Sequence, residues 1–413
     1  MGGASARTIG AIIISILPLV AAGQSARTLR DRDPDLSGAK RLAAELQEAT
    51  FHSGPWYFLT RLRIADAGYT ETGYLPTDEG DSGLALTVEA PQRIYYVPHK
   101  KVVFSGELVP AYNIIKRGDE SDRFDYLARA DMHLLFNHLY LDTYALRADQ
   151  LRGYVDVNEL ARTRDEETGI SGELKYSSRT SAQFTARYRK EEYPDHQFGE
   201  DETPLGLLDR DERNGRVSFI HKTFPLTALF VSAEGSNYGF RNATYKDSKR
   251  RWVGAGFQYD SGRSRIRLEA GPATLDFEDP TQHDFSGAIG TLRMTRVNGR
   301  WTYAAGATRD VGFSIVLNNN YYVADSVTGG IDYVATRRLS LRANVVAERH
   351  TYDVAVLPGQ FREDHVSFYS VGFGYTLSKF RFGVDGGWYE RDSTLGGDSD
   401  SGIRYVLHLS FVP

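Results

Sequence analysis

Residues 123–135, RFDYLARADMHLL, carry the pattern that decides the fold. Apolar Phe124, Tyr126 and Met132 alternate with polar Asp125 and Arg129. Successive side chains of a β-strand point to opposite faces, so a period of two predicts a strand with one apolar and one polar face. The same alternation recurs in 182–189, AQFTARYR, and in 403–411, IRYVLHLSF.

Segments of this kind follow one another from Trp56 to the end of the chain. We place eighteen strands, or sixteen if neighbouring segments merge. They are expected at about 55–68, 82–97, 100–115, 123–136, 139–151, 167–177, 180–191, 212–222, 226–240, 249–260, 263–276, 284–296, 299–309, 321–335, 338–352, 364–377, 379–391 and 402–412.

The connections between these strands alternate in length. Short ones, such as 98–100, 261–262 and 297–299, alternate with longer acidic ones, such as 70–81 and 191–211. A soluble sandwich has no reason to alternate in this way, whereas a membrane barrel has short turns on one side and long loops on the other. We therefore predict an all-β, transmembrane, antiparallel up-and-down β-barrel with both termini in the periplasm.

The first residues resemble an export signal. Arg7 precedes an apolar run at 9–22 that ends in small residues, and this run is shorter than the roughly 20 residues that cross a bilayer as a helix. We expect a signal peptide at 1–23, a periplasmic segment with a short helix at 24–54, and the barrel at 55–413. The periplasmic segment is interpreted as a mobile tail, a partial plug or a dock for a periplasmic partner.

Composition agrees with a barrel of the bacterial outer membrane. The chain has 40 Gly, 25 Tyr and 21 Phe but only 41% hydrophobic residues, which suits half-polar strands with aromatic girdles. It has no cysteine, which excludes a lipoprotein anchor, disulfides and a Cys-ligated metal. The expected surroundings are outer-membrane lipid and lipopolysaccharide.

A closed sheet of so many strands encloses a wide, watery lumen. The polar faces of the strands carry fifteen basic and eight acidic residues, although the whole chain has a net charge of −5. An excess of arginine in a pore favours anions. The expected pore-lining residues are Arg61, Arg63, Arg129, Arg147, Lys175, Arg187, Arg189, Arg216, Arg265, Arg267, Arg293, Arg342, Arg381 and Arg404.

No enzymatic constellation stands out. His133, His350 and His408 are scattered, and none lies in a nucleophile motif. Acidic pairs such as Asp165-Glu166 fall in predicted loops, and no glycine-rich phosphate loop is present. We expect no catalytic residue, no cofactor, no metal and no nucleic-acid partner.

The region 62–411 resembles the putative β-barrel porin 2 family. The resemblance lies in the opening strand 61–69, RLRIADAGY, in 185–189, TARYR, and in 388–393, WYERDS. It implies passage of a secreted exopolysaccharide through the outer membrane, as in the similar alginate-type exporters with basic lumens. A periplasmic polysaccharide-export protein would then deliver the polymer, and the family has no catalytic residues.

Three functions remain open at this point. The first is an export conduit for an anionic exopolysaccharide, and the second is a general diffusion porin for small anionic solutes. The third is a non-transporting barrel that displays its acidic loops as an adhesin. A diffusion porin should have its third external loop folded inward to narrow the pore. The third external loop, expected at 152–166, is short, and the fourth, at 191–211, is the longest. The fourth loop is interpreted either as a lid or as a disordered tip.

Overall fold

The computed structural model describes residues 38–71, 83–116, 122–154, 159–194, 204–316, 319–355, 359–394 and 400–411. They form one α-helix, two short 3-10 helices and twenty-one strands. The elements are α1 (Gly38–Gln47), β1 (Phe51–Ser53), β2 (Trp56–Thr60), β3 (Leu62–Glu71), β4 (Gly83–Glu89), β5 (Gln92–His99), β6 (Val102–Lys116), β7 (Arg123–Leu135), β8 (Leu139–Tyr154), β9 (Glu159–Lys175), β10 (Thr180–Glu192), η1 (Pro204–Leu208), β11 (Arg210–Phe224), β12 (Thr227–Phe240), η2 (Thr244–Lys246), β13 (Ser248–Asp260), β14 (Ser264–Phe277), β15 (Phe285–Asn298), β16 (Trp301–Phe313), β17 (Tyr321–Val334), β18 (Leu339–Thr351), β19 (Glu363–Leu377), β20 (Phe380–Ser393) and β21 (Asp400–Phe411).

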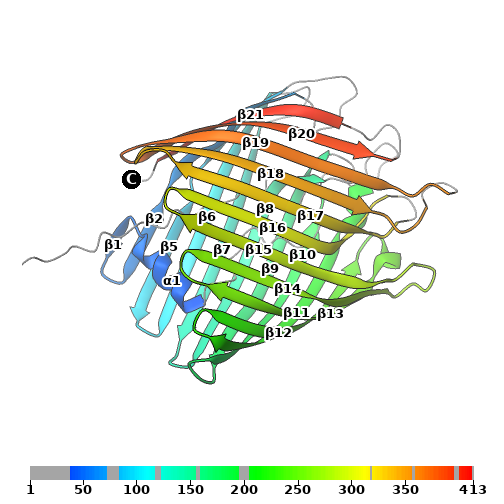
Figure 1. Cartoon of the computed structure of the whole chain (residues 1–413), viewed down its shortest axis with the longest axis horizontal. Helices are drawn as coiled ribbons and strands as arrows, with labels where there is room; N and C mark the ends of the chain where they lie inside the picture. Colours follow the sequence, from blue (N-terminus) through cyan, green and yellow to red (C-terminus); the bar gives the residue numbers. More distant parts are fainter. Residues whose placement is uncertain are drawn as a thin grey trace, which may run out of the picture.

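The strands close into a single antiparallel barrel (Figure 1). Consecutive strands pair along the sheet, and β21 returns to β3, with Phe411 opposite Leu62. Two strands of the wall are interrupted: β2 and β3 continue one another across Arg61, and β4 and β5 continue across 90–91. Because β1 pairs with β2 alone, the closed barrel has eighteen strands, which confirms the predicted fold.

All eighteen predicted strands are found, with one marked difference in length. β9 begins at Glu159 and not near 167, so the expected third external loop is mostly strand. The pair Asp165-Glu166 therefore lies in the barrel wall, in register with 147–148 of β8. The alternating pattern does not reveal this extension, because residues 159–166 include charged side chains on both faces of the strand.

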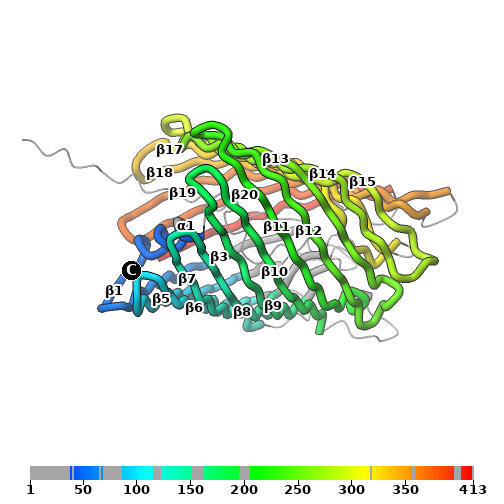
Figure 2. Tube along the Cα trace, turned by 90° about the horizontal axis from the view of Figure 1, so that it is seen from below, coloured from blue at the N-terminus to red at the C-terminus, as the bar shows by residue number. Residues whose placement is uncertain are grey.

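The short connections gather at one end of the barrel, here called the turn end, and the long ones at the loop end (Figure 1). The described chain also ends at the turn end, where Phe411 of β21 lies. The strands are tilted relative to the barrel axis, as closure of a sheet into a barrel requires (Figure 2). The expected signal peptide lies outside the described residues, and the periplasmic position of the termini stays a prediction.

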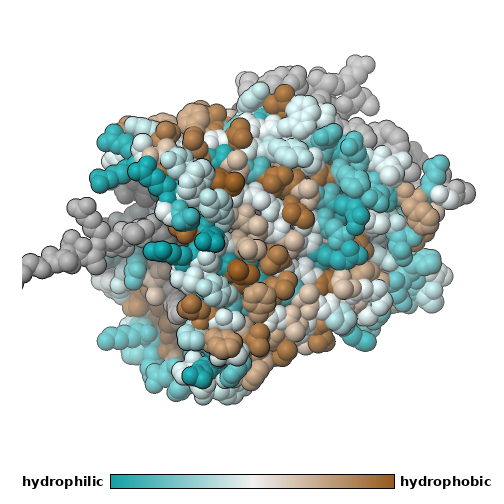
Figure 3. All heavy atoms as spheres, in the orientation of Figure 1, coloured by the Kyte–Doolittle hydropathy of each residue, from teal (hydrophilic) through white to brown (hydrophobic). Residues whose placement is uncertain are grey.

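The outer surface is apolar around the middle of the barrel. Val327, Val371 and Val253 are at least 60% exposed although they lie in mid-strand. Figure 3 shows apolar residues gathered between two more polar ends. At the turn end, Trp301 packs on Tyr333 with ring centroids 4.3 Å apart, as in an aromatic girdle. Since such a surface is stable only against lipid, the closed barrel resides in the bacterial outer membrane.

The helix α1 differs in character from a membrane span. None of the described helices is long and apolar enough to cross a bilayer. Instead, α1 packs by Leu42 against Tyr95 of β5 and Val103 of β6. These two side chains alternate with the outward-facing Ile94 and Phe104, so α1 lies on the lumen side of the wall.

The two faces of β17 offer a direct test of this arrangement. Val327 faces lipid, whereas the adjacent Thr328 lines the lumen. We expect Val327→Arg to destabilise the barrel by about 2–4 kcal/mol, the cost of a lipid-facing arginine near the bilayer centre. Thr328→Arg, which adds the same charge on the watery side, should cost far less. Urea titration of the barrel folded in liposomes measures both, and equal costs would contradict the assignment of faces.

Candidate lumen site

A cavity of about 1360 Å³ occupies the interior of the barrel. It is lined by residues of β3, β4 and every strand from β7 to β21. Its wall is chemically divided. Charged side chains dominate on β7–β14, here called the charged wall, and small uncharged polar side chains dominate on β15–β19, here called the hydroxyl wall.

The charged wall is held together by ion pairs. Arg187 donates to Glu212 at 2.7 Å, between adjacent strands β10 and β11. Arg216 of β11 reaches further: it bonds Glu234 of β12 at 3.4 Å and also Glu269 of β14. Such pairs satisfy buried charge without leaving much net field, because each guanidinium faces a carboxylate.

An ion pair and a group of aromatic contacts reach across the interior between strands that are not neighbours in the wall. Arg250 of β13 donates to Asp310 of β16 at 2.7 Å. Phe313, at the end of β16, meets the rings of Tyr238 and Phe240 of β12 edge-on at centroid distances of 4.9 Å. Contacts between strands three and four apart fill this side of the barrel, so the open space lies toward the rest of the hydroxyl wall.

The loop end of the barrel is narrowed by segments folded inward. Leu205 and Leu208 of η1, in the described end of the loop expected to be the fourth external one, are fully buried. Lys246 of η2 is also buried, and its ammonium donates to the carbonyl of Ser314 in the connection between β16 and β17. The apolar cluster at this mouth, here called the mouth cluster, comprises Tyr193, Leu205, Leu208, Tyr238, Phe240, Ala243, Trp252, Ala273, Leu275, Phe277, Phe285, Ile289, Phe313, Ile315 and Tyr321.

The inward fold of this loop bears on the choice between functions. The sequence left it open as a lid or a free tip; residues 195–203 lie outside the described part of the chain. The part from Pro204 onward is an inward constriction. It is the feature that we expected of a diffusion porin, but it comes from the fourth loop.

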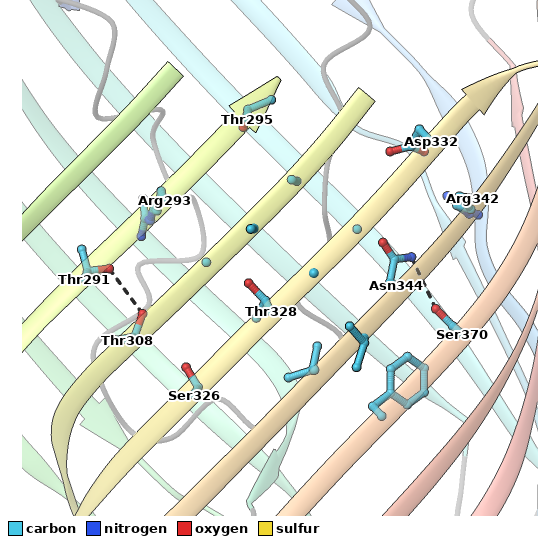
Figure 4. Close-up of a pocket in the computed structure, with 18 of the residues that line it drawn as sticks. Thr291, Arg293, Thr295, Thr308, Ser326, Thr328, Asp332, Arg342, Asn344 and Ser370 are labelled. Carbon is cyan, nitrogen blue, oxygen red and sulfur yellow. Dashed lines mark hydrogen bonds between the residues drawn. The ribbon is translucent and has the colours of Figure 1, made fainter. Parts of the chain in front are cut away.

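The hydroxyl wall presents alternate side chains of neighbouring strands to the lumen (Figure 4). Thr291 of β15 lies 3.3 Å from the hydroxyl of Thr308 of β16, and Asn344 of β18 donates to Ser370 of β19 at 3.4 Å. Thr328 and Ser326 of β17 lie between these pairs. Hydroxyls both donate and accept, so this wall can replace the water around a polar solute.

Between the hydroxyl wall and the turn end, charged side chains form one compact group. Arg342 binds Asp385 of β20 through two nitrogens, with Nε at 2.6 Å, and Asp385 also lies 2.8 Å from His408 of β21. Gly372 on β19 is what allows this contact. A Cβ there would lie 1.8 Å from the Asp385 carboxylate, so a larger residue would displace the pair.

Eight of the fourteen expected pore-lining residues do line the cavity. They are Arg63, Arg129, Arg187, Arg216, Arg293, Arg342, Arg381 and Arg404. Arg265 and Arg267 belong to β14 below the cavity, where Arg267 lies over the ring of Phe230. Lys175 ends β9, and Arg61 lies at the interruption of the first strand, bound to Glu48 at 3.4 Å. The role of these residues in guiding solutes stays a prediction.

Two expected pore residues are placed differently. Arg147 lies on the outer face, 3.6 Å from Glu166, because its neighbours Leu146 and Ala148 are the buried, lumen-side residues of β8. Arg189 is on the lumen side but is only 4% exposed, since it is enclosed by Asp165 and Glu191. The parity of the polar residues misleads in β8 because its apolar side chains pack inside and not against lipid.

The lumen also holds more acid than the sequence indicated. Glu89, Glu167, Glu212 and Asp310 line the cavity in addition to the acidic residues expected there. Arginines still outnumber carboxylates among the lining residues, but by less than fifteen to eight. Glu89, Glu167 and Glu212 fall within expected strands but are not among the residues expected on the lumen face there, whereas Asp310 lies one residue beyond the expected strand 299–309.

Among the described residues, one group has the geometry of a metal site: Asp131, His133 and Asp142. Its members already bind one another and their neighbours. Arg129 holds Asp131 through two nitrogens, and His133 contacts Asp142 and Tyr140 at 3.0 Å each. Its side chains thus form a network of hydrogen bonds and ion pairs within the wall.

Comparisons with known proteins support the barrel. No family model and no curated protein sequence matches this chain. Among solved structures, the chain is similar to OccAB4 of Acinetobacter baumannii, with a TM-score of 0.50 and 12% identity over 88% of this chain and 99% of that one. It is likewise similar to OpdO of Pseudomonas aeruginosa, at 0.50 and 12% over 86% and 96%.

A bacterial polysaccharide outer membrane secretin is also similar, with 11% identity over 86% of this chain and 98% of that chain, but its TM-score is 0.36. At these identities the likeness concerns the fold alone. The chain is thus an eighteen-stranded barrel built like solved outer-membrane proteins, and what passes through it has to be argued from its own lumen.

Proposed function

We propose that this protein is an outer-membrane channel for small anionic solutes. The observation that carries the proposal is a set of arginines at the turn end of the cavity, Arg337, Arg338 and Arg381. All three line the cavity, and none of them forms an ion pair with any residue that the structure describes. Uncompensated guanidinium groups in a confined lumen raise the local concentration of anions.

The position of these arginines suits a path along the hydroxyl wall. Arg338 immediately precedes β18, and its carbonyl accepts a hydrogen bond from the amide of Thr376 on β19, which in turn lies opposite Arg381 on β20. Three neighbouring strands therefore bring two guanidinium groups and a hydroxyl to the same side of the lumen. The opposite, charged wall contributes little net attraction, because its arginines are paired.

The inward-folded fourth loop supports small solutes over a polymer. With the mouth cluster and Lys246 filling one side of the loop end, the passage is restricted where an emerging chain would have to leave. The structures of OpdO and OccAB4 have the same kind of barrel, which is consistent with a channel.

The alternative is export of an anionic exopolysaccharide, the function implied by the resemblance to the porin 2 family. The hydroxyl wall favours it, since Thr291, Thr308 and Asn344 could exchange hydrogen bonds with successive sugar hydroxyls. A periplasmic polysaccharide-export protein would be the partner in that case. A deletion strain separates the two functions: loss of small-anion uptake with normal polysaccharide secretion favours the channel, and the reverse result favours export.

The unpaired arginines should set the ion preference of the channel. In planar bilayers under a salt gradient, we expect the wild type to prefer anions. Arg338→Glu and Arg381→Glu should each lower the anion-to-cation permeability ratio severalfold, because each reverses an uncompensated charge in the path. Arg251→Glu is the control, since its side chain is 74% exposed on the outer face. A cation-selective wild type would overturn the proposal.

A second change should act in the opposite direction. Asp385→Asn removes the carboxylate that neutralises Arg342 and so frees a guanidinium beside the path. We expect the anion preference to increase, as read from the reversal potential. Asp325→Asn removes the same charge from the outer face, where Asp325 binds Arg309 and Arg349, and should leave selectivity unchanged. If both variants shift selectivity equally, the effect is one of total charge and not of the lumen.

A further inference from the structure

The helix α1 occupies the lumen side of the wall at the turn end. Leu42 is 2% exposed and packs on Tyr95 of β5 and Val103 of β6. Gly38, at the start of the helix, rests on the ring of Tyr140 of β8; a Cβ there would lie 2.0 Å from that ring. The helix thus crosses the inner surface of four neighbouring strands, β5–β8, close to the turn-end opening (Figure 1).

Polar contacts add little to this docking. The hydroxyl of Tyr95 donates to Glu45 at 3.0 Å, Arg93 lies 3.8 Å from Glu45, and Arg61 lies 3.4 Å from Glu48. The side chains of both ion pairs are between one quarter and one half exposed. Pairs of this kind contribute little to stability in water. Apolar packing by the buried Leu42 and the partly buried Leu46 therefore carries most of the attachment.

The sequence of α1 does not favour a stable helix in the absence of contacts with the wall. It is only ten residues long, and it has neither an acidic residue in its first turn nor a basic residue in its last. Isolated helices of this length are marginal in water, and the missing charges remove the favourable interaction with the helix dipole. An undocked α1 is therefore expected to lose its helical structure.

The two ends of the lumen differ in how many buried side chains hold the segments that narrow them. The mouth cluster at the loop end joins fifteen buried side chains from β12–β17, η1 and their connections. At the turn end, Leu42 is the single buried residue among the described side chains of α1. Local opening follows the weaker packing, so α1 at the turn end is the element that we expect to detach more readily.

We propose that α1 is a displaceable plug: docked, it narrows the turn-end mouth of the lumen, and released, it unfolds and widens that mouth. The proposal rests on the proposed channel function. The closed state is the one in the structure, with Leu42 between Tyr95 and Val103. The open state has the same barrel with the inner surface of β5–β8 exposed to water.

Single-channel recording of the full chain in planar bilayers tests this. Leu42→Asp places a charge where the helix is buried, so α1 should remain undocked and the mean conductance should rise severalfold. Ala43→Asp adds the same charge on the exposed side of the same helix and should conduct like the wild type. Equal conductance of the two variants, with both barrels folded by heat-modifiability on gels, would overturn the plug.

A reversible crosslink supplies the complementary measurement. The chain has no cysteine, so Leu42→Cys with Val103→Cys introduces a single pair across the contact. Oxidation should abolish the high-conductance events, and reduction should restore them. High-conductance events that persist in the oxidised protein would refute the proposal. The permeability ratio in the same recordings reports on the channel proposal separately, because it depends on the arginines and not on α1.

Discussion

The whole structure depends on the requirement that every backbone amide and carbonyl in a bilayer be paired inside the protein. Pairing of β21 with β3 meets it by removing the free edges of the sheet. Even the interrupted strands obey it. At the break the amide of Arg61 donates to Pro91 at 3.0 Å, and that of Ala90 to Pro110 at 3.1 Å. The wall therefore stays continuous where two of its strands are broken.

Closure with eighteen strands also determines the environment of the side chains that face the lumen. The ring is too wide for wall residues to fill it, so inward-facing arginines would lie in a confined space with their charge uncompensated. On the charged wall they are neutralised by carboxylates, in part by reaching across the interior, as Arg216 does to Glu269 and Arg250 to Asp310. These bridges crowd one side of the barrel and leave the other open.

Much of this could be predicted from the sequence, and the exceptions have physical causes. Strand positions follow from the alternation of apolar and polar residues between turn sequences. This pattern depends only on residues close together in the chain, so the sequence alone reveals it. Which face of the wall a side chain occupies is harder to predict from the sequence. Arg147 is charged yet lies on the outer face, because the apolar Leu146 and Ala148 next to it pack inward. The docking of α1 and of η1 depends on contacts between residues far apart in the chain. Leu42 meets Tyr95 and Leu205 joins Phe240 in the mouth cluster, and no periodicity records such contacts.

The division of the lumen into two walls bears on how a channel can be both selective and fast. A solute has to be attracted strongly enough to enter and held weakly enough to leave. A wall of exposed, unpaired arginines alone would retain anions, whereas paired arginines alone would not attract them. In this barrel Arg338 and Arg381 at one end provide attraction, and the threonines and Ser326 of the hydroxyl wall provide neutral hydrogen bonds in place of water. Because hydroxyls bind no more strongly than the water that they replace, a solute drawn toward the arginines can still move along that wall.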